Sequence, residues 1–147
     1  MFCCCGSSAV APDAPSLRGI SSLCFESTFL QEVLQAGHRR EDPVYAVEED
    51  VIRRRGAHLR CPADGRQGTS YVDALATKPL VDQSEFMLSY SWGYAVGAIS
   101  DALRDALGSQ EHRYVWICCL CINQHRVKEA QVRANKPGWI SGCLGVM

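Results

Sequence analysis

The chain has 147 residues, of which 47% are apolar and 21% are charged, and its formal charge at pH 7 is −1. This composition is that of a globular domain and excludes a wholly disordered chain. The balance of 15 basic and 16 acidic residues provides no basic face for nucleic acid, and no apolar run approaches the ~20 residues that span a bilayer.

Residues 1–19 predict a flexible tail that carries three consecutive cysteines. The segment combines glycine, serine and proline and shows no apolar period, which is typical of irregular chain. Neighbouring exposed thiols near a terminus are candidates for S-acylation, and two or more acyl chains anchor a protein stably. We therefore expect either lipidation at Cys3, Cys4 and Cys5, with membrane association, or an unmodified tail.

The cysteine content is high, with nine in the chain. Besides the three at the N-terminus, Cys118, Cys119 and Cys121 crowd one segment, and adjacent cysteines pair poorly because a disulfide requires converging Cβ atoms. An odd number also leaves one thiol without a partner. We predict reduced thiols and a cytoplasmic location, with membrane attachment only through an acylated N-terminus.

Residues 20–84 predict one helix followed by a charged, irregular segment. Apolar residues within 21–36 are mostly three, four or seven positions apart, which is typical of a short amphipathic helix, and Gly37 is placed to end it. Residues 38–66 contain seven arginines and six acids, which predicts a solvated face. The pattern at 71–75 fits either a helix or a strand.

Residues 85–134 predict a βαβ unit. Phe86–Leu88 is a short apolar strand, and Tyr114–Leu120 is a second strand that is apolar on both faces, as in parallel sheets covered by helices. Apolar residues between them recur at steps of three, four and four, which predicts an amphipathic helix that Gly108 ends. A strand, helix and strand of these lengths close as a right-handed crossover. The helical stripe consists of Val96, Ile99, Leu103 and Leu107.

The fold class that these elements predict is α/β, with a parallel sheet built around one βαβ unit. Lys128–Ala134 fits the start of a further helix, and residues 135–147 form an irregular tail without a periodic pattern. A doubly wound sheet needs more strands than this chain supplies, and open edges would remain. We therefore expect an incomplete domain, with a truncated, non-functional gene product as one alternative.

Polar and aromatic residues follow both predicted strands. The carboxyl ends of consecutive parallel strands share one sheet edge, which is where open α/β folds bind ligands. The serines there can hydrogen-bond a ligand or satisfy turn amides. The aromatic rings can stack on a base or pack against the core, and the amides need a ligand or a neighbouring loop as partner. The candidate binding residues are Ser89, Tyr90, Ser91, Trp92, Asn123 and Gln124.

Cys118, Cys119, Cys121 and His125 are close enough in sequence to suggest a metal site. Structural zinc prefers closely spaced cysteines in loops. In a strand, Cys118 faces away from Cys119 and Cys121. We therefore predict no metal site and interpret these cysteines as buried and inert. His125 is either an acid/base group or a residue at the start of a helix.

Two motifs resemble those of the fungal heterokaryon-incompatibility (HET) domain. Leu88–Gly93 resembles its opening motif, LSYxWG, and Tyr114–Gln124 resembles its second motif, YxWIDALCINQ. Glu129–Val132 is similar to a Glu-Arg pair and the following Gln-Val in that family. The resemblance covers residues 85–132, and the aspartate of the second motif is replaced by Cys118 here.

The HET domain is similar in fold to TIR domains, so the resemblance implies a flavodoxin-like parallel sheet and a role in self/non-self recognition and cell-death signalling. It also implies protein partners through TIR-like self-association. Some TIR relatives cleave the glycosidic bond of NAD with a glutamate, which makes NAD a candidate ligand and Glu129 the candidate catalytic carboxylate. The alternative for Glu129 is a surface residue paired with Arg126 or Arg133. The resemblance thus predicts a partial, degenerate signalling or interaction module, with a nucleotide glycohydrolase as the alternative.

Overall fold

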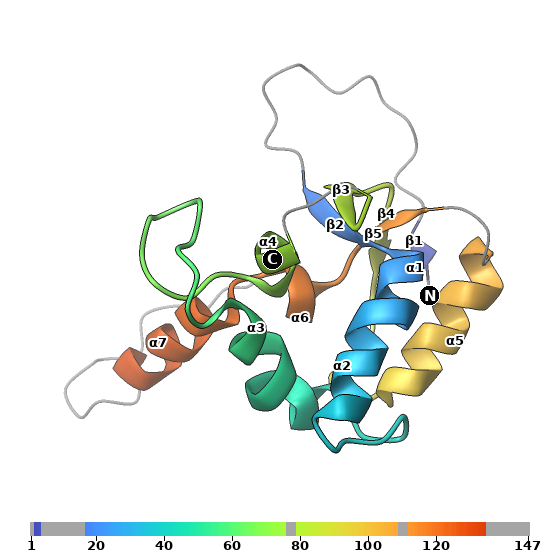
Figure 1. Ribbon diagram of the computed structural model, residues 1–147, viewed down its shortest axis with the longest axis horizontal. Helices are drawn as coiled ribbons and strands as arrows, with labels where there is room; N and C mark the ends of the chain where they lie inside the picture. The colour runs from blue at the N-terminus through green and yellow to red at the C-terminus, as the bar shows by residue number, and fades with distance from the viewer. Residues whose placement is uncertain (1, 4–16, 76–78, 109–111, 135–147) are drawn as a thin grey trace.

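The computed structural model describes residues 2–3, 17–75, 79–108 and 112–134 (Figure 1). Within these ranges, five strands form one mixed sheet in the order β1-β4-β5-β2-β3. Helices pack against this sheet, which confirms the predicted α/β class. No helix of the described ranges is long and apolar enough to cross a membrane. The strands are β1 (Phe2–Cys3), β2 (Arg18–Ser21), β3 (Val81–Gln83), β4 (Phe86–Leu88) and β5 (Tyr114–Trp116).

The predicted βαβ unit is present. β4 and β5 are parallel neighbours, with Met87 opposite Trp116. Helix α5 (Val96–Leu107) connects them and buries the predicted apolar stripe in the core. Gly108 ends the helix with a φ of 77°, a conformation that glycine adopts without a steric penalty. The buried residues of the stripe are Val96, Ile99 and Leu103.

The rest of the sheet differs from the prediction. β2 pairs antiparallel with both β3 and β5, and β1 pairs antiparallel with β4, so β4–β5 is the only parallel pair among the described strands. The prediction of a parallel sheet is wrong because the second neighbour of β5 comes from residues 18–21, which precede the βαβ unit and run the opposite way. β2 therefore occupies the side of β5 on which a further parallel strand would pair.

Two parts of the predicted N-terminal tail lie in the sheet. Cys3 is opposite Met87 in the β1–β4 pair, and β2 begins at Arg18. These pairings come from partners distant in sequence, which the local pattern of residues 1–19 does not indicate. Cys4 and Cys5 lie outside the described residues, so their lipidation stays a prediction. The tail predicted at 135–147 lies outside them as well.

The helix predicted near the N-terminus runs from Ser22 to Gln35 as three continuous segments. Gly37 follows it with a φ of 90°, as expected for a helix end. The middle segment has π-type turns and contributes Phe25 and Phe29, whose ring centroids are 4.9 Å apart in the core. The helix packs beside α5 (Figure 1). Its segments are α1 (Ser22–Cys24), η1 (Phe25–Phe29) and α2 (Leu30–Gln35).

Helical turns occupy part of the charged segment at 38–66, where the sequence predicts irregular structure. Arg53 and Glu48 form a half-buried ion pair within it, with Nε 2.6 Å from Oε1. The sequence prediction is wrong because charged residues outnumber the apolar ones in this segment, so the helical spacing of the apolar residues is not evident from the sequence. The buried stripe is Val44, Val47, Val51 and Ile52. The helical segments are η2 (Val44–Val47), η3 (Glu48–Arg53) and α3 (Arg54–Gly56), and the undecided segment at 71–75 is helix α4 (Tyr71–Leu75).

Strand β5 is shorter than predicted. It ends at Trp116, Ile117 is extended with a φ of −127°, and Cys118–Cys121 forms helix α6. The backbone N–H groups of Leu120 and Cys121 both donate to the carbonyl oxygen of Ile117, at 3.0 and 2.9 Å. A strand reaching Leu120 is therefore wrong, because an unbroken apolar run fits a buried helical turn as well as a strand.

Helix α7 (Gln124–Ala134) begins before the predicted start at Lys128. Asn123 caps it, since its side-chain Oδ1 accepts a hydrogen bond from the His125 backbone N–H at 3.1 Å. An asparagine in this position satisfies an amide group that the first turn of a helix leaves unpaired. The polar end of the second motif is therefore the start of a helix.

Candidate functional site

Tyr90 is the second residue after β4 and reaches across to α6. Its hydroxyl oxygen accepts a hydrogen bond from the Cys119 backbone N–H at 3.3 Å, and the Cys118 thiol donates to the same oxygen at 3.4 Å. Burial raises the pKa of the Tyr90 hydroxyl far above its usual range, so the group stays protonated. The ring joins the two motifs by packing and hydrogen bonding.

Asn123 and Gln124 find their partners within the chain. The Nδ2 group of Asn123 donates to the Gly68 carbonyl oxygen at 2.9 Å, in addition to its capping role. Gln124 is only 6% exposed, and its Nε2 group donates to the carbonyl oxygens of Cys118 and Ile122 at 3.2 and 3.3 Å. Both amides therefore have intramolecular partners, and ligand binding by them stays a prediction.

Ser89 and Ser91 are exposed after β4. The Ser91 Oγ accepts the Gly93 backbone N–H at 3.3 Å, and the Ser91 carbonyl oxygen accepts the Tyr94 N–H at 2.9 Å. Ser91 therefore shapes a tight turn, which is the alternative to ligand binding that the sequence indicates. Ser89 immediately precedes Tyr90 in the sequence and is exposed at the start of this segment.

Trp92 lines a cavity of about 340 Å³ together with Gln124, so the structure brings together one candidate residue from each motif. Its carbonyl oxygen accepts the Tyr45 backbone N–H at 3.2 Å, and Tyr45, 63% exposed, borders the same cavity. Pockets of this size accept small molecules. The other lining residues are Glu48, Val127, Lys128 and Gln131.

Glu129 lies in a cluster of ion pairs between α7 and the loop 57–70. Its Oε2 is 2.5 Å from Nη2 of Arg66, and its Oε1 is 3.1 Å from Nη1 of Arg126. The Arg66 guanidinium, above all, holds the pKa of the Glu129 carboxyl below its ordinary value. Arg126 also lies 2.7 Å from Asp64 and keeps the pKa of that carboxyl well below its usual range. Glu129 is therefore ionised and doubly paired.

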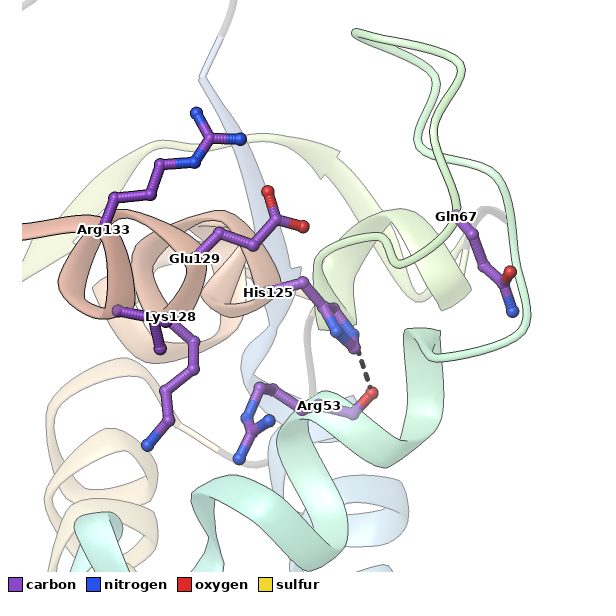
Figure 2. A pocket seen from close by; sticks show the side chains of 7 residues that line it. Arg53, Gln67, His125, Lys128, Glu129 and Arg133 are labelled. Carbon is purple, nitrogen blue, oxygen red and sulfur yellow. Dashed lines mark hydrogen bonds between the residues drawn. The ribbon is translucent and has the colours of Figure 1, made fainter. Parts of the chain in front are cut away.

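A second cavity, of about 420 Å³, lies on the side of α7 from which Glu129 projects (Figure 2). The His125 ring is turned toward η3, with Nε2 3.0 Å from the Arg53 carbonyl oxygen. Because a carbonyl only accepts, this nitrogen carries the proton. Gly68 lies against the ring at a φ of 89°, and a Cβ added there would be 2.8 Å from the His125 Cγ. The imidazole is therefore a packed contact between α7, η3 and the loop.

The two cavities lie on neighbouring faces of α7, and Lys128 borders both. Trp92 borders one cavity and Glu129 the other. A stacking ring and a catalytic carboxylate acting on one nucleotide would have to face the same space. The face toward the Trp92 cavity carries Gln124, Val127 and Gln131. The face toward the Glu129 cavity carries His125, Glu129 and Val132.

The cysteines after β5 are free thiols. Cys119 is 2% exposed, whereas Cys118 and Cys121 are half-buried. Burial raises the pKa of the Cys121 thiol to about 12 and that of Cys119 further still. Within the described ranges, no group of three or more His, Cys, Asp or Glu side chains is placed to hold a metal ion.

The sequence does not indicate which loop residues contact α7. Asp64, Arg66 and Gly68 approach this helix from positions distant in sequence. Pro62 and the Asp64-Gly65 pair indicate a turn, and the chain does turn there. A turn signal does not name the partner of a turn, so the cluster is visible only in three dimensions.

Comparison with known proteins gives no relative: no protein-family model, curated protein or solved structure matches this chain. The resemblance to HET and TIR-like domains therefore rests on the two motifs.

Proposed function

We propose that this chain is a HET/TIR-like signalling or interaction module that binds other proteins, among them a second copy of itself, and that does not cleave nucleotides. The two motifs support the family, since each begins within a strand of the parallel β4–α5–β5 unit and continues past its end. A flavodoxin-like arrangement is part of this proposal for that unit alone, because the neighbouring strands run antiparallel.

The observation that carries the proposal is that three motif side chains hydrogen-bond to the backbone of the chain itself. Tyr90, Asn123 and Gln124 all hydrogen-bond to backbone groups of the chain itself. A binding pocket for a small molecule directs a few polar groups at its ligand. These three side chains instead stabilise α6, the start of α7 and the loop 57–70, which supports a structural role for the motifs.

The surroundings of Glu129 also favour a non-catalytic module. Cleavage of a glycosidic bond passes through an oxocarbenium-like state, which a neighbouring carboxylate stabilises through its negative charge. Each carboxylate oxygen of Glu129 already lies beside a guanidinium group, from Arg66 or from Arg126. A charge that is compensated in this way offers less stabilisation to a second, developing cation.

Incubation of the full chain with NAD, followed by chromatography for nicotinamide, tests the absence of catalysis. We expect no release above the buffer control from a sample that shows a cooperative thermal transition. The matched variant Glu129→Gln keeps the size of the side chain and removes its charge. Release by the parent chain that disappears in Glu129→Gln would contradict the proposal.

Light scattering across a range of protein concentrations tests the binding part. We expect the average mass to rise with concentration, as for a module that associates with its own copies. A constant monomer mass up to high concentration would exclude self-association as the mode of action.

A nucleotide glycohydrolase is the second candidate, and the cavity beside Trp92 is the observation in its favour. Trp92, the exposed Tyr45 and the buried Gln124 border a space large enough for a nucleobase. Under this candidate, Trp92→Ala abolishes the nicotinamide release of an active parent chain. An inactive parent chain excludes the candidate in the same assay.

A further inference from the structure

Because residues 118–121 form a helix and not a strand, two cysteines of the second motif lie on the same face. Residues three apart point to opposite faces of a strand but to the same face of a helix. Cys118 and Cys121 are the first and last residues of α6, so they share a face. Ideal helix geometry puts their Cα atoms about 5 Å apart, within the range of about 4.4–6.8 Å that a disulfide spans.

The hydrogen bonds of the two thiols place both sulfur atoms near the start of α6. The Sγ of Cys121 accepts the backbone N–H of Ile117 at 3.3 Å, so this side chain points back toward the residue that precedes Cys118. The Cys118 thiol donates to the Tyr90 hydroxyl at 3.4 Å. Both cysteines are half-buried, whereas Cys119 between them is enclosed in the core.

We propose that Cys118 and Cys121 form a vicinal dithiol that a low-molecular-weight disulfide, such as glutathione disulfide, oxidises reversibly to an intramolecular disulfide. The site is a Cys-x-x-Cys pair on a helical turn directly after a strand, an arrangement that is typical of thiol–disulfide exchange. It is a modification site that does not depend on the proposed function.

The exchange proceeds in two steps that balance. The Cys118 thiolate attacks one sulfur of the glutathione disulfide, forms a mixed disulfide and releases one glutathione thiolate. The Cys121 thiolate then attacks the Cys118 sulfur, forms the Cys118–Cys121 bond and releases the second glutathione thiolate. The two protons lost by the cysteines go to the two glutathione thiolates. The protein dithiol is oxidised by two electrons, and the glutathione disulfide is reduced.

The surroundings assign the order of attack. The Cys121 sulfur is turned back onto the Ile117 N–H at 3.3 Å, and burial raises its pKa to about 12, so Cys118 is the first nucleophile. Cys121 acts second, when the activated Cys118 sulfur lies next to it. Cys119 takes no part because its enclosed side chain points away from the shared face.

Oxidation changes the junction between β4 and α6. Cβ atoms at this spacing in a helix are about 5–6 Å apart, and a disulfide needs about 3.5–4.5 Å, so α6 has to tighten. The Cys118 sulfur then loses its proton and its hydrogen bond to Tyr90, and the contact between Ile117 and Cys121 is altered. The bond between Tyr90 and the Cys119 amide remains as the link to β4.

Mass spectrometry of the folded, full chain tests the proposal. After equilibration with glutathione disulfide and rapid alkylation, trypsin cleaves at Arg113 and Arg126 and yields one peptide, 114–126, that contains all three cysteines. We expect a peptide that is lighter by two hydrogens and alkylated once, with fragment ions that locate the alkyl group on Cys119. A peptide with three alkyl groups, or a bridge that includes Cys119, would overturn the proposal.

Single variants separate the two steps. Cys119→Ala keeps the bridge, whereas Cys121→Ser stops at a glutathione adduct on Cys118 and Cys118→Ser forms neither product. An adduct that accumulates on Cys121 in Cys118→Ser would contradict the order of attack. The parent chain unfolded in guanidinium is the control for the helix, because without α6 the preference for Cys121 over Cys119 is lost. Equal bridging to both cysteines in the folded chain would also overturn the proposal.

Discussion

Replacing Tyr90 with Phe removes one oxygen from the junction between β4 and α6 and leaves the ring in place. That oxygen accepts the Cys119 backbone N–H at 3.3 Å and the Cys118 thiol at 3.4 Å. Because Cys119 is enclosed in the core, water does not take over the lost acceptor. An unpaired buried donor costs about 1–3 kcal/mol, and the long N···O distance favours the lower half of that range. We therefore expect Tyr90→Phe to lower the free energy of unfolding by about 1–2 kcal/mol.

Urea unfolding followed by tryptophan fluorescence measures this loss, with an unchanged m-value as the sign that the denatured state is the same. Cys118→Ala is the matched control. It removes the weaker thiol donor while the Cys119 amide stays paired with Tyr90, so it should cost less, and the double variant gives the coupling between the two changes. A loss below about 0.5 kcal/mol for Tyr90→Phe would contradict a buried hydrogen bond at this hydroxyl, since surface changes of no structural consequence fall in that range.

Three further changes test other parts of the molecule. Gly68→Ala, at a φ of 89° and with its Cβ 2.8 Å from an imidazole ring, should lower the free energy of unfolding more than Gly65→Ala, at 68° with nothing within 4 Å. The positive φ alone costs about 1–2 kcal/mol, so equal losses would contradict the packing. Ile99→Asp buries an unpaired charge and should abolish the cooperative thermal transition in circular dichroism, whereas the exposed Ala98→Asp on the same helix should melt like the parent. The folded pKa of Asp64 is depressed, so its contribution to stability is present above the ordinary value of 3.8 and is lost as pH falls through the folded pKa. Asp64→Asn should lack that acid-dependent loss, and superimposable acid profiles for the two chains would show that the ion pair contributes nothing.

The βαβ unit was predictable because its signals are local and repeated. The stripe from Val96 to Leu107 covers about three helical turns, and an apolar run stands on each side of it. β2 and β3 are three or four residues long and gain their stability from partners distant in sequence, so their own residues carry little information. The sequence does not indicate helix α6, because an apolar run does not show where the backbone hydrogen bonds change from those of a β-sheet to those of a helix.

The candidate site could be predicted from the sequence only in part. The sequence indicates that Asn123 and Gln124 need partners, and it names Arg126 as one partner of Glu129. It does not indicate Gly68 or Arg66, because both come from a loop whose contacts depend on the tertiary fold. The local sequence pattern therefore indicates which groups require a hydrogen bond or an ion pair. The identity of the distant partner follows only from the packing of the core.

Helix α7 is attached to the molecule largely by polar contacts. Among its described side chains Gln124 is the only buried one, and the helix is connected to the loop 57–70 by the Asp64–Arg126–Glu129–Arg66 ion pairs. Dissolved salt weakens exposed ion pairs but leaves apolar burial intact. Hydrogen exchange in α7 should therefore speed up with ionic strength while exchange in α5 stays constant. In a cell, a change in ionic strength would therefore alter how tightly α7 is held against the loop 57–70, while the packing of α5 would not respond.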